Sequence, residues 1–178
     1  MLALARSAIL SVLTGGTGKT SASEPPCFRL RRGVFVTIHV DGKLRGCIGV
    51  IEGRETLGQS IVQCAESAAF HDPRFPALRL DEIAGLQIEI SVLSELFLLD
   101  PEKIEIGKHG LFIVTAHRQG LLLPQVAVEH GLSREQFREE TCRKAGLPSD
   151  AWRSREAQLF GFTCEILRED ISAGATAE

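Results

Sequence analysis

The fold is decided by one stretch of the sequence, Val34-Phe35-Val36-Thr37-Ile38-His39-Val40-Asp41-Gly42-Lys43-Leu44-Arg45-Gly46-Cys47-Ile48-Gly49. The residues before Asp41 are dense in β-branched side chains, which favour a strand. Asp41-Gly42 is a two-residue turn signal, and the apolar residues that follow it return along a second strand. The sequence therefore predicts a β-hairpin over residues 34–51.

The register of this hairpin decides what Cys47 faces. With Asp41 and Gly42 in the turn, an unbroken ladder places Cys47 opposite Val36 and Leu44 opposite His39. Because side chains alternate between faces, Cys47 and His39 then point to opposite sides of the sheet, which disfavours a Cys47–His39 pair. A β-bulge at a glycine would shift the pairing by one residue and reverse this conclusion.

Within the hairpin, Cys47 is the candidate catalytic residue. Its neighbours Gly46 and Gly49 lack a Cβ, so a ligand or another backbone can approach the thiol closely. A nearby guanidinium, that of Arg45, favours the thiolate, which is the nucleophilic and metal-binding form. The alternative is a buried thiol in a tight hairpin, since free cysteine is among the most buried residue types.

Two further segments offer binding candidates. The run from Asp72 to Pro76 is stiff because its two prolines fix φ. Arg74 in this run is able to hold an anionic ligand, and equally Asp72 is able to pair with Arg74 or to cap the turn. His109 precedes a second predicted hairpin and is a candidate acid or base, although loop histidines are more often bystanders.

The remaining periodicities predict a mixture of helices and strands. Helical spacing and stop signals predict helices near residues 2–13, 56–70 and 133–145, the last beginning with a capping box at Ser133 and Gln136. Alternation predicts further strands at 86–93, 111–115, 121–124 and 160–166. Because strands occur in hairpins as well as between helices, the class is α+β with largely antiparallel sheet.

Composition narrows the function classes. The formal net charge is −3 and the pI is near 6.0, so no overall positive field attracts polyanions and we expect no nucleic-acid partner. The five cysteines form no Cys-x-x-Cys pair and the histidines show no zinc spacing, so no metal or cofactor is predicted. The apolar opening segment is too short to span a membrane. We therefore expect a soluble, cytoplasmic protein with reduced thiols.

Taken together, these motifs resemble the AMMECR-domain family, also called protein A of the AmmeMemoRadiSam system. The resemblance rests on the hairpin with LRGCIG, the run AAF followed by DPRFP, and IEISVL. It continues through IGKHGL, GLLLPQVA and CRKAGL with Trp152, and it covers about residues 1–168.

The resemblance implies an architecture and an association. It implies an AMMECR-like domain over residues 1–170, with two interleaved subdomains of mostly antiparallel sheet flanked by helices and a cleft between them lined by LRGCIG. A flexible connection is expected at 14–26 and a disordered tail at 171–178. It also implies association with a Memo-like protein and a radical SAM protein. This chain has no Cys-x-x-x-Cys-x-x-Cys run, so it is not expected to be the iron-sulfur member.

Two functional hypotheses follow. In the first, Cys47 is a nucleophile or redox group of an enzyme, Arg45 favours its thiolate, and Arg74 orients an acidic or carbonyl substrate. In the second, the chain is a non-catalytic module that presents a substrate or a protein partner, and Cys47 is a packing residue. The chain is expected to be a monomer or a small homo-oligomer.

Overall fold

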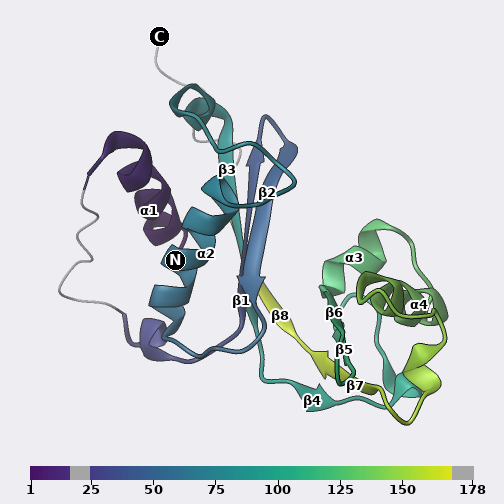
Figure 1. Cartoon of the computed structure of the whole chain (residues 1–178). Helices are drawn as coiled ribbons and strands as arrows, with labels where there is room; N and C mark the ends of the chain where they lie inside the picture. Colours follow the sequence, from purple (N-terminus) through teal and green to yellow (C-terminus); the bar gives the residue numbers. More distant parts are fainter. Residues whose placement is uncertain (17–24, 170–178) are drawn as a thin grey trace. The chain divides into compact units, whose positions relative to one another are not determined.

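The computed structural model describes residues 1–16 and 25–169 and divides the chain into two compact units (Figure 1). The first unit contains Met1–Val92 and the segment that begins at Glu165, and the second contains Leu93–Cys164. Most of the predicted connection at 14–26 and the whole predicted tail at 171–178 lie outside the described residues. The predicted α+β class is confirmed, since each unit combines helices with a four-stranded antiparallel sheet.

The first unit is built around the predicted hairpin. Its sheet has the strand order β2-β1-β3-β8. Asp41 and Gly42 have φ angles of 51° and 75°, as a tight hairpin turn with two left-handed residues requires. The elements of this unit are α1 (Leu2–Thr14), η1 (Pro26–Arg29), β1 (Val34–Val40), β2 (Lys43–Val50), α2 (Leu57–Phe70), η2 (Leu80–Gly85), β3 (Leu86–Leu93) and β8 (Cys164–Arg168).

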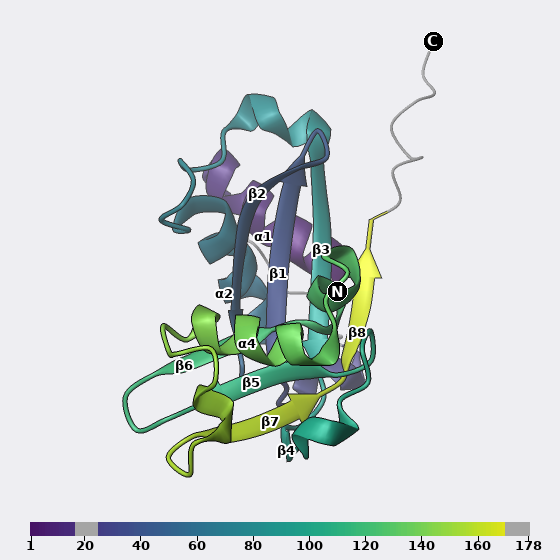
Figure 2. The ribbon, with the colours of Figure 1, turned by 90° about the vertical axis from the view of Figure 1, so that its right-hand side faces the viewer.

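Both long helices of the first unit lie on the same side of its sheet (Figure 2). The strand residues that alternate toward this side, Val36, Ile38 and Ile90, are fully buried against the helices. Cys64 of α2 lies in the same core, and burial raises the pKa of its thiol to about 11. Alternation leaves every second side chain of β1, β2 and β3 on the opposite side, which we call the second face.

The second unit repeats this plan with a different strand order, β4-β7-β5-β6. Helices α3 and α4 share its core with β5, whose Leu111 and Ile113 are fully buried beside Phe137. The predicted capping box of Ser133 and Gln136 begins α4. The elements of this unit are β4 (Phe97–Leu98), η3 (Pro101–Lys103), β5 (Gly110–Val114), β6 (Gln119–Leu122), α3 (Pro124–Glu129), α4 (Arg134–Lys144), η4 (Ala151–Arg153) and β7 (Gln158–Phe162).

One strand prediction was wrong. The alternation over 160–166 predicted a single strand, but the structure has two, and Thr163 separates β7 from β8. The two strands belong to different sheets, so the chain passes from one unit to the other at this point. Period-2 alternation continues across the break and gives no sign of it.

Candidate functional site

A β-bulge corrects the predicted register around Cys47. Leu44 pairs with His39 as predicted, but the next pair is Gly46 with Ile38, so Arg45 is the extra residue of the bulge. Cys47 therefore pairs with Thr37 and not with Val36. The prediction that Cys47 and His39 face opposite sides was wrong, because the bulge brings both onto the second face.

On the second face, a row of polar side chains crosses the sheet at Cys47. Thr37 pairs with Cys47 on one side and with Glu89 on the other. The Thr37 hydroxyl donates to the Cys47 sulfur at 3.1 Å, and Arg168 Nε lies 2.5 Å from Glu89 Oε2. The side chain of Glu89 is only 14% exposed. The half-buried thiol is thus the end member of a row that runs from β2 to β8.

The backbone of Cys47 is held by a buried carboxylate. Asp72 follows α2, and its side chain is 2% exposed. Its Oδ2 accepts from the Cys47 N–H at 2.9 Å and from Arg74 Nη2 at 2.6 Å, while its Oδ1 accepts from Arg74 Nε at 2.9 Å. These bonds to Arg74, helped by the one from Cys47, keep the pKa of the Asp72 carboxyl well below its usual value even though burial opposes this.

Arg74 completes the arrangement at the edge of the sheet. Its Nη2 donates to the Cys47 carbonyl at 3.2 Å, and Asp72 raises the pKa of its guanidinium. β2 is an edge strand, and a residue's N–H and C=O point to the same side of an antiparallel strand. Asp72 and Arg74 therefore occupy both backbone groups that Cys47 presents at the free edge. The arginine side chain stays half exposed.

Arg45 is directed at a neighbouring loop. Its Nε and Nη2 donate to the two carboxylate oxygens of Glu82 at 2.8 and 3.1 Å, and this pairing lowers the pKa of Glu82. The same guanidinium donates to the carbonyls of Pro76 and Ala77. All three of its nitrogens are thus engaged in holding the segment after Arg74 against β2.

The two glycines have a packing role. A Cβ on Gly46 would overlap the Ala68 carbonyl oxygen of α2, so this glycine lets the helix backbone approach the strand. A Cβ on Gly49 would overlap the ring of Phe35 on the second face. The positions need glycine for these neighbours, whether or not a ligand approaches the thiol.

His109 belongs to the second unit and makes its contacts there. It is 7% exposed, its Nδ1 accepts from the Glu105 N–H at 3.2 Å, and its ring meets that of Phe97 edge-on at 5.7 Å. The structure thus brings six of the seven predicted site residues together on the first unit: Arg45, Gly46, Cys47, Gly49, Asp72 and Arg74.

Sequence reasoning missed three members of the site, namely Thr37, Glu89 and Arg168. The alternation over residues 86–93 predicted the strand that carries Glu89, but only the bulge places Cys47 on the same face as Glu89. Across residues 1–16 and 25–169, no group of three or more His, Cys, Asp or Glu residues is placed to hold a metal ion. In the same residues, no helix combines the length and apolar character that crossing a membrane requires.

Known proteins are similar to this chain in sequence and in fold. The profile of the AMMECR1 family matches residues 2–167. A Methanosarcina acetivorans protein is 42% identical, with 98% of this chain and 92% of that protein covered. A Methanopyrus kandleri protein is also 42% identical, with 100% and 91% covered. The crystal structure of an uncharacterized Pyrococcus horikoshii protein matches with a TM-score of 0.89 and 38% identity, over 95% of this chain and 89% of that one.

The two sheets with their flanking helices define an α+β protein of the kind seen in that crystal structure. The chain belongs to the AMMECR1 family, as its motifs predicted.

Proposed function

We propose that the chain acts in a modification pathway together with a Memo-like protein and a radical SAM protein, and that Cys47 is its nucleophile or redox group. The association with these partners is what the resemblance to the AMMECR-domain family implies, and the chain belongs to that family. The proposed ligand is acidic or carbonyl-bearing, because the Arg74 side chain is half exposed and a guanidinium donates hydrogen bonds to such oxygens.

One observation carries this proposal: a half-buried thiol stands on a backbone whose free N–H and C=O are fixed by Asp72 and Arg74. Reactive groups work best when the structure around them holds them in place. Thr37 adds a second constraint, since its hydroxyl donates a hydrogen bond to the Cys47 sulfur. A packing cysteine requires none of these polar contacts.

The alkylation rates of the cysteines test the proposal. In the full chain at neutral pH, iodoacetamide should modify Cys47 faster than the exposed Cys27, although Cys27 is the more accessible. The buried Cys64 and Cys142, whose thiol pKa values are raised by burial, should react slowest and serve as internal controls. Thr37→Val should change the rate at Cys47 and leave the rate at Cys27 unchanged.

A complementation experiment in cells is the second test of the role of Cys47. Cys47→Ser should fail to complement cells that lack the chain, while Cys27→Ser should complement fully. Equal alkylation rates at Cys47 and Cys27, or full complementation by Cys47→Ser, would contradict the role of the thiol.

The alternative function is a non-catalytic module that presents a substrate or a protein partner. It is favoured by the packing role of Gly46 and by the engagement of Arg45 with Glu82, which leave both residues without a chemical task at the thiol. Turnover by the isolated protein, together with a pulldown that captures no partner, would argue against this alternative.

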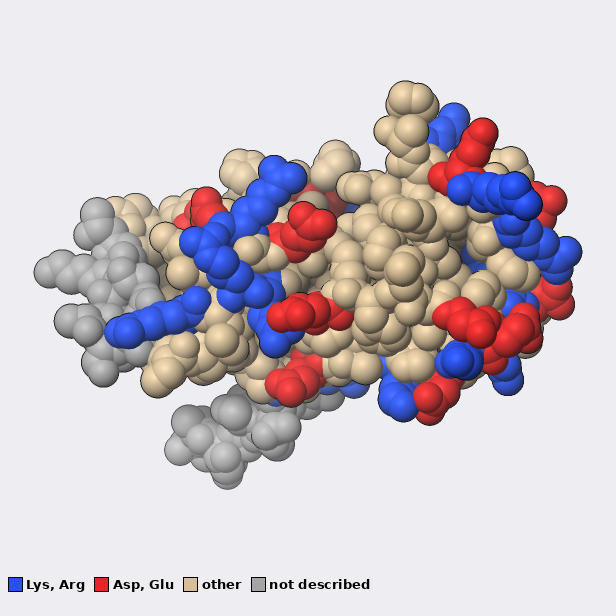
Figure 3. All heavy atoms as spheres, turned by 90° about the horizontal axis from the view of Figure 1, so that it is seen from below, with Lys and Arg blue, Asp and Glu red and all other residues tan. Residues whose placement is uncertain are grey.

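The proposed partners are proteins or small molecules, and neither nucleic acid nor a membrane is among them. Basic and acidic side chains lie interspersed on the face drawn in Figure 3, and the formal net charge is −3. A polyanion binds through many like-charged basic groups, so mixed charges support a protein or small-molecule partner. A monomer or a small homo-oligomer fits this proposal.

A further inference from the structure

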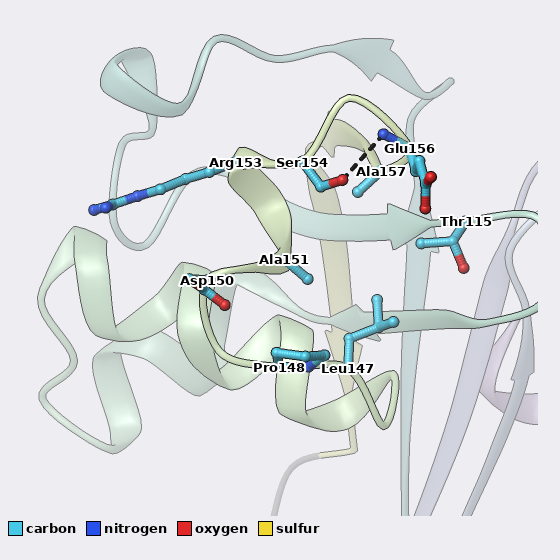
Figure 4. A pocket seen from close by; sticks show the side chains of 9 residues that line it. All are labelled: Thr115, Leu147, Pro148, Asp150, Ala151, Arg153, Ser154, Glu156 and Ala157. Atoms are coloured by element: carbon cyan, nitrogen blue, oxygen red, sulfur yellow. Dashed lines mark hydrogen bonds between the residues drawn. The ribbon is translucent and has the colours of Figure 1, made fainter.

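A cavity in the second unit lies beside η4 and the end of β5 (Figure 4). Its volume is about 480 Å³, which lies within the range of small-molecule sites. Apolar groups form much of its lining, contributed by Leu147, Pro148, Ala151 and Ala157. No residue of the Cys47 site takes part in it, so this cavity is independent of the function proposed above.

Two carboxylates in the lining give the cavity its charge. Asp150 and Glu156 lie on different sides of the apolar group in Figure 4. Within the part of the chain that the structure describes, neither carboxylate forms an ion pair. The Ser154 hydroxyl accepts from the Glu156 N–H at 3.2 Å, a bond that holds the loop carrying Glu156. Both negative charges are therefore available to a ligand.

The single cation in the lining, Arg153, is engaged outside the cavity. Its guanidinium lies over the Trp152 ring at 4.7 Å, and its Nη2 is 3.5 Å from Glu135 Oε1. In Figure 4 its side chain extends away from the other lining residues. Neither Trp152 nor Glu135 belongs to the lining, so both of these contacts of the Arg153 guanidinium are made outside the cavity.

We propose that this cavity binds an aliphatic diamine. The methylene chain lies on the apolar surface of Leu147, Ala151 and Ala157, where burial removes it from water. One ammonium group lies near Asp150 and the other near Glu156, so each positive charge meets a negative one. A ligand with a single charge, or with none, satisfies this lining less well.

Methyl NMR spectra of the full chain test the proposal directly. Titration with 1,4-diaminobutane should shift the methyl signals of Leu147, Ala151 and Ala157 saturably. Because the carboxylates are solvent-exposed, the diamine should bind only about threefold to fivefold more tightly than butylamine at the same ionic strength. The neutral 1,4-butanediol should bind more weakly than either amine. The absence of saturable shifts, or equal affinity for the diol and the diamine, would overturn the proposal.

Two neutralising variants sharpen the test. Asp150→Asn and Glu156→Gln should each reduce the affinity for the diamine to about the affinity for butylamine, since each removes one of two charge contacts. Glu129→Gln, which changes an exposed carboxylate outside the cavity, is the matched control and should leave the affinity unchanged. If the control weakens binding as much as the other two, the diamine is responding to net charge and the site is refuted.

Discussion

The second faces of the two sheets differ in chemistry although the sheets share one plan. In the first unit this face carries Cys47, Thr37 and Glu89, which are neighbours in one row across the sheet, with a hydrogen bond between Thr37 and Cys47. In the second unit the corresponding face carries Phe112 opposite Phe160, with ring centroids 6.2 Å apart. The same alternation of side chains thus carries a polar row in one unit and a packed pair of aromatic rings, with Phe112 only 7% exposed, in the other.

The units also share one device for packing a helix against a strand. A Cβ on Gly46 of β2 would overlap the backbone of Ala68 in α2, and a Cβ on Gly120 of β6 would overlap the backbone of Ala145 after α4. Both glycines let the last turn of a helix approach the sheet. The comparison predicts that a Cβ added at either packing glycine destabilises its unit to the same extent, while the two second faces respond differently to mutation.

The largest effect is expected at the packing glycines. Gly46→Ala and Gly120→Ala should each lower the free energy of unfolding of their own unit by about 3 kcal/mol, because backbone atoms have to move to admit the Cβ. Amide hydrogen exchange, read separately for each unit, measures this loss. Protection lost equally in both units after one substitution would show that the units do not unfold independently.

The next effect is expected at Asp72. Asp72→Asn should lower the free energy of unfolding of the first unit by about 2 kcal/mol at pH 7, because it removes a buried charge that holds Arg74 and the Cys47 amide. The folded-state pKa of this carboxyl lies below the unfolded value of about 3.9, so its stabilisation is present at neutral pH. That stabilisation is lost as the pH falls below the unfolded value toward the folded one.

The pH dependence of the variant provides the check. The free energy of unfolding, measured with urea, should fall below about pH 4 more steeply for the wild type than for Asp72→Asn. The two free energies should converge in acid. Parallel curves for the two proteins would refute the stabilising role of the ionised carboxylate.

A smaller effect is expected at Arg45. Arg45→Ala should lower the free energy of unfolding of the first unit by about 1 to 2 kcal/mol, since the side chain is only 14% exposed and its loss removes both guanidinium hydrogen bonds to the Glu82 carboxylate, which keeps only the bond from the Arg79 N–H. Arg79→Ala is the matched control, because it removes an ion pair with Asp81 in which both side chains are more than 60% exposed. The control should stay within about 0.5 kcal/mol of wild type in urea unfolding. A cost at Arg79 as large as that at Arg45 would contradict the contrast.

Much of this fold follows from local sequence signals. The Asp41-Gly42 turn, the capping box at Ser133 and the alternation of β3 were all identified from short-range patterns, and the structure confirms them. Such signals act over a few residues and depend little on tertiary packing. The family and the α+β class followed from their combination.

The register of the site did not follow from these signals. The extra residue at Arg45 is paired outward with Glu82, which lies far along the chain, and Gly46 is required by the backbone of α2. These are tertiary contacts that the hairpin sequence alone does not contain. The one-residue shift makes Thr37, and not Val36, the partner of Cys47. The polar row therefore could not be predicted from the sequence without the register of the strands.

The occupied edge at Cys47 restricts how any partner can reach the thiol. A peptide that extends a sheet needs unpaired N–H and C=O groups along the outer strand. At Cys47 the Asp72 carboxylate and the Arg74 guanidinium already take these groups. A substrate or protein partner must therefore reach the sulfur over the face shared with Thr37, where side-chain shape and polarity select it, and not by strand addition.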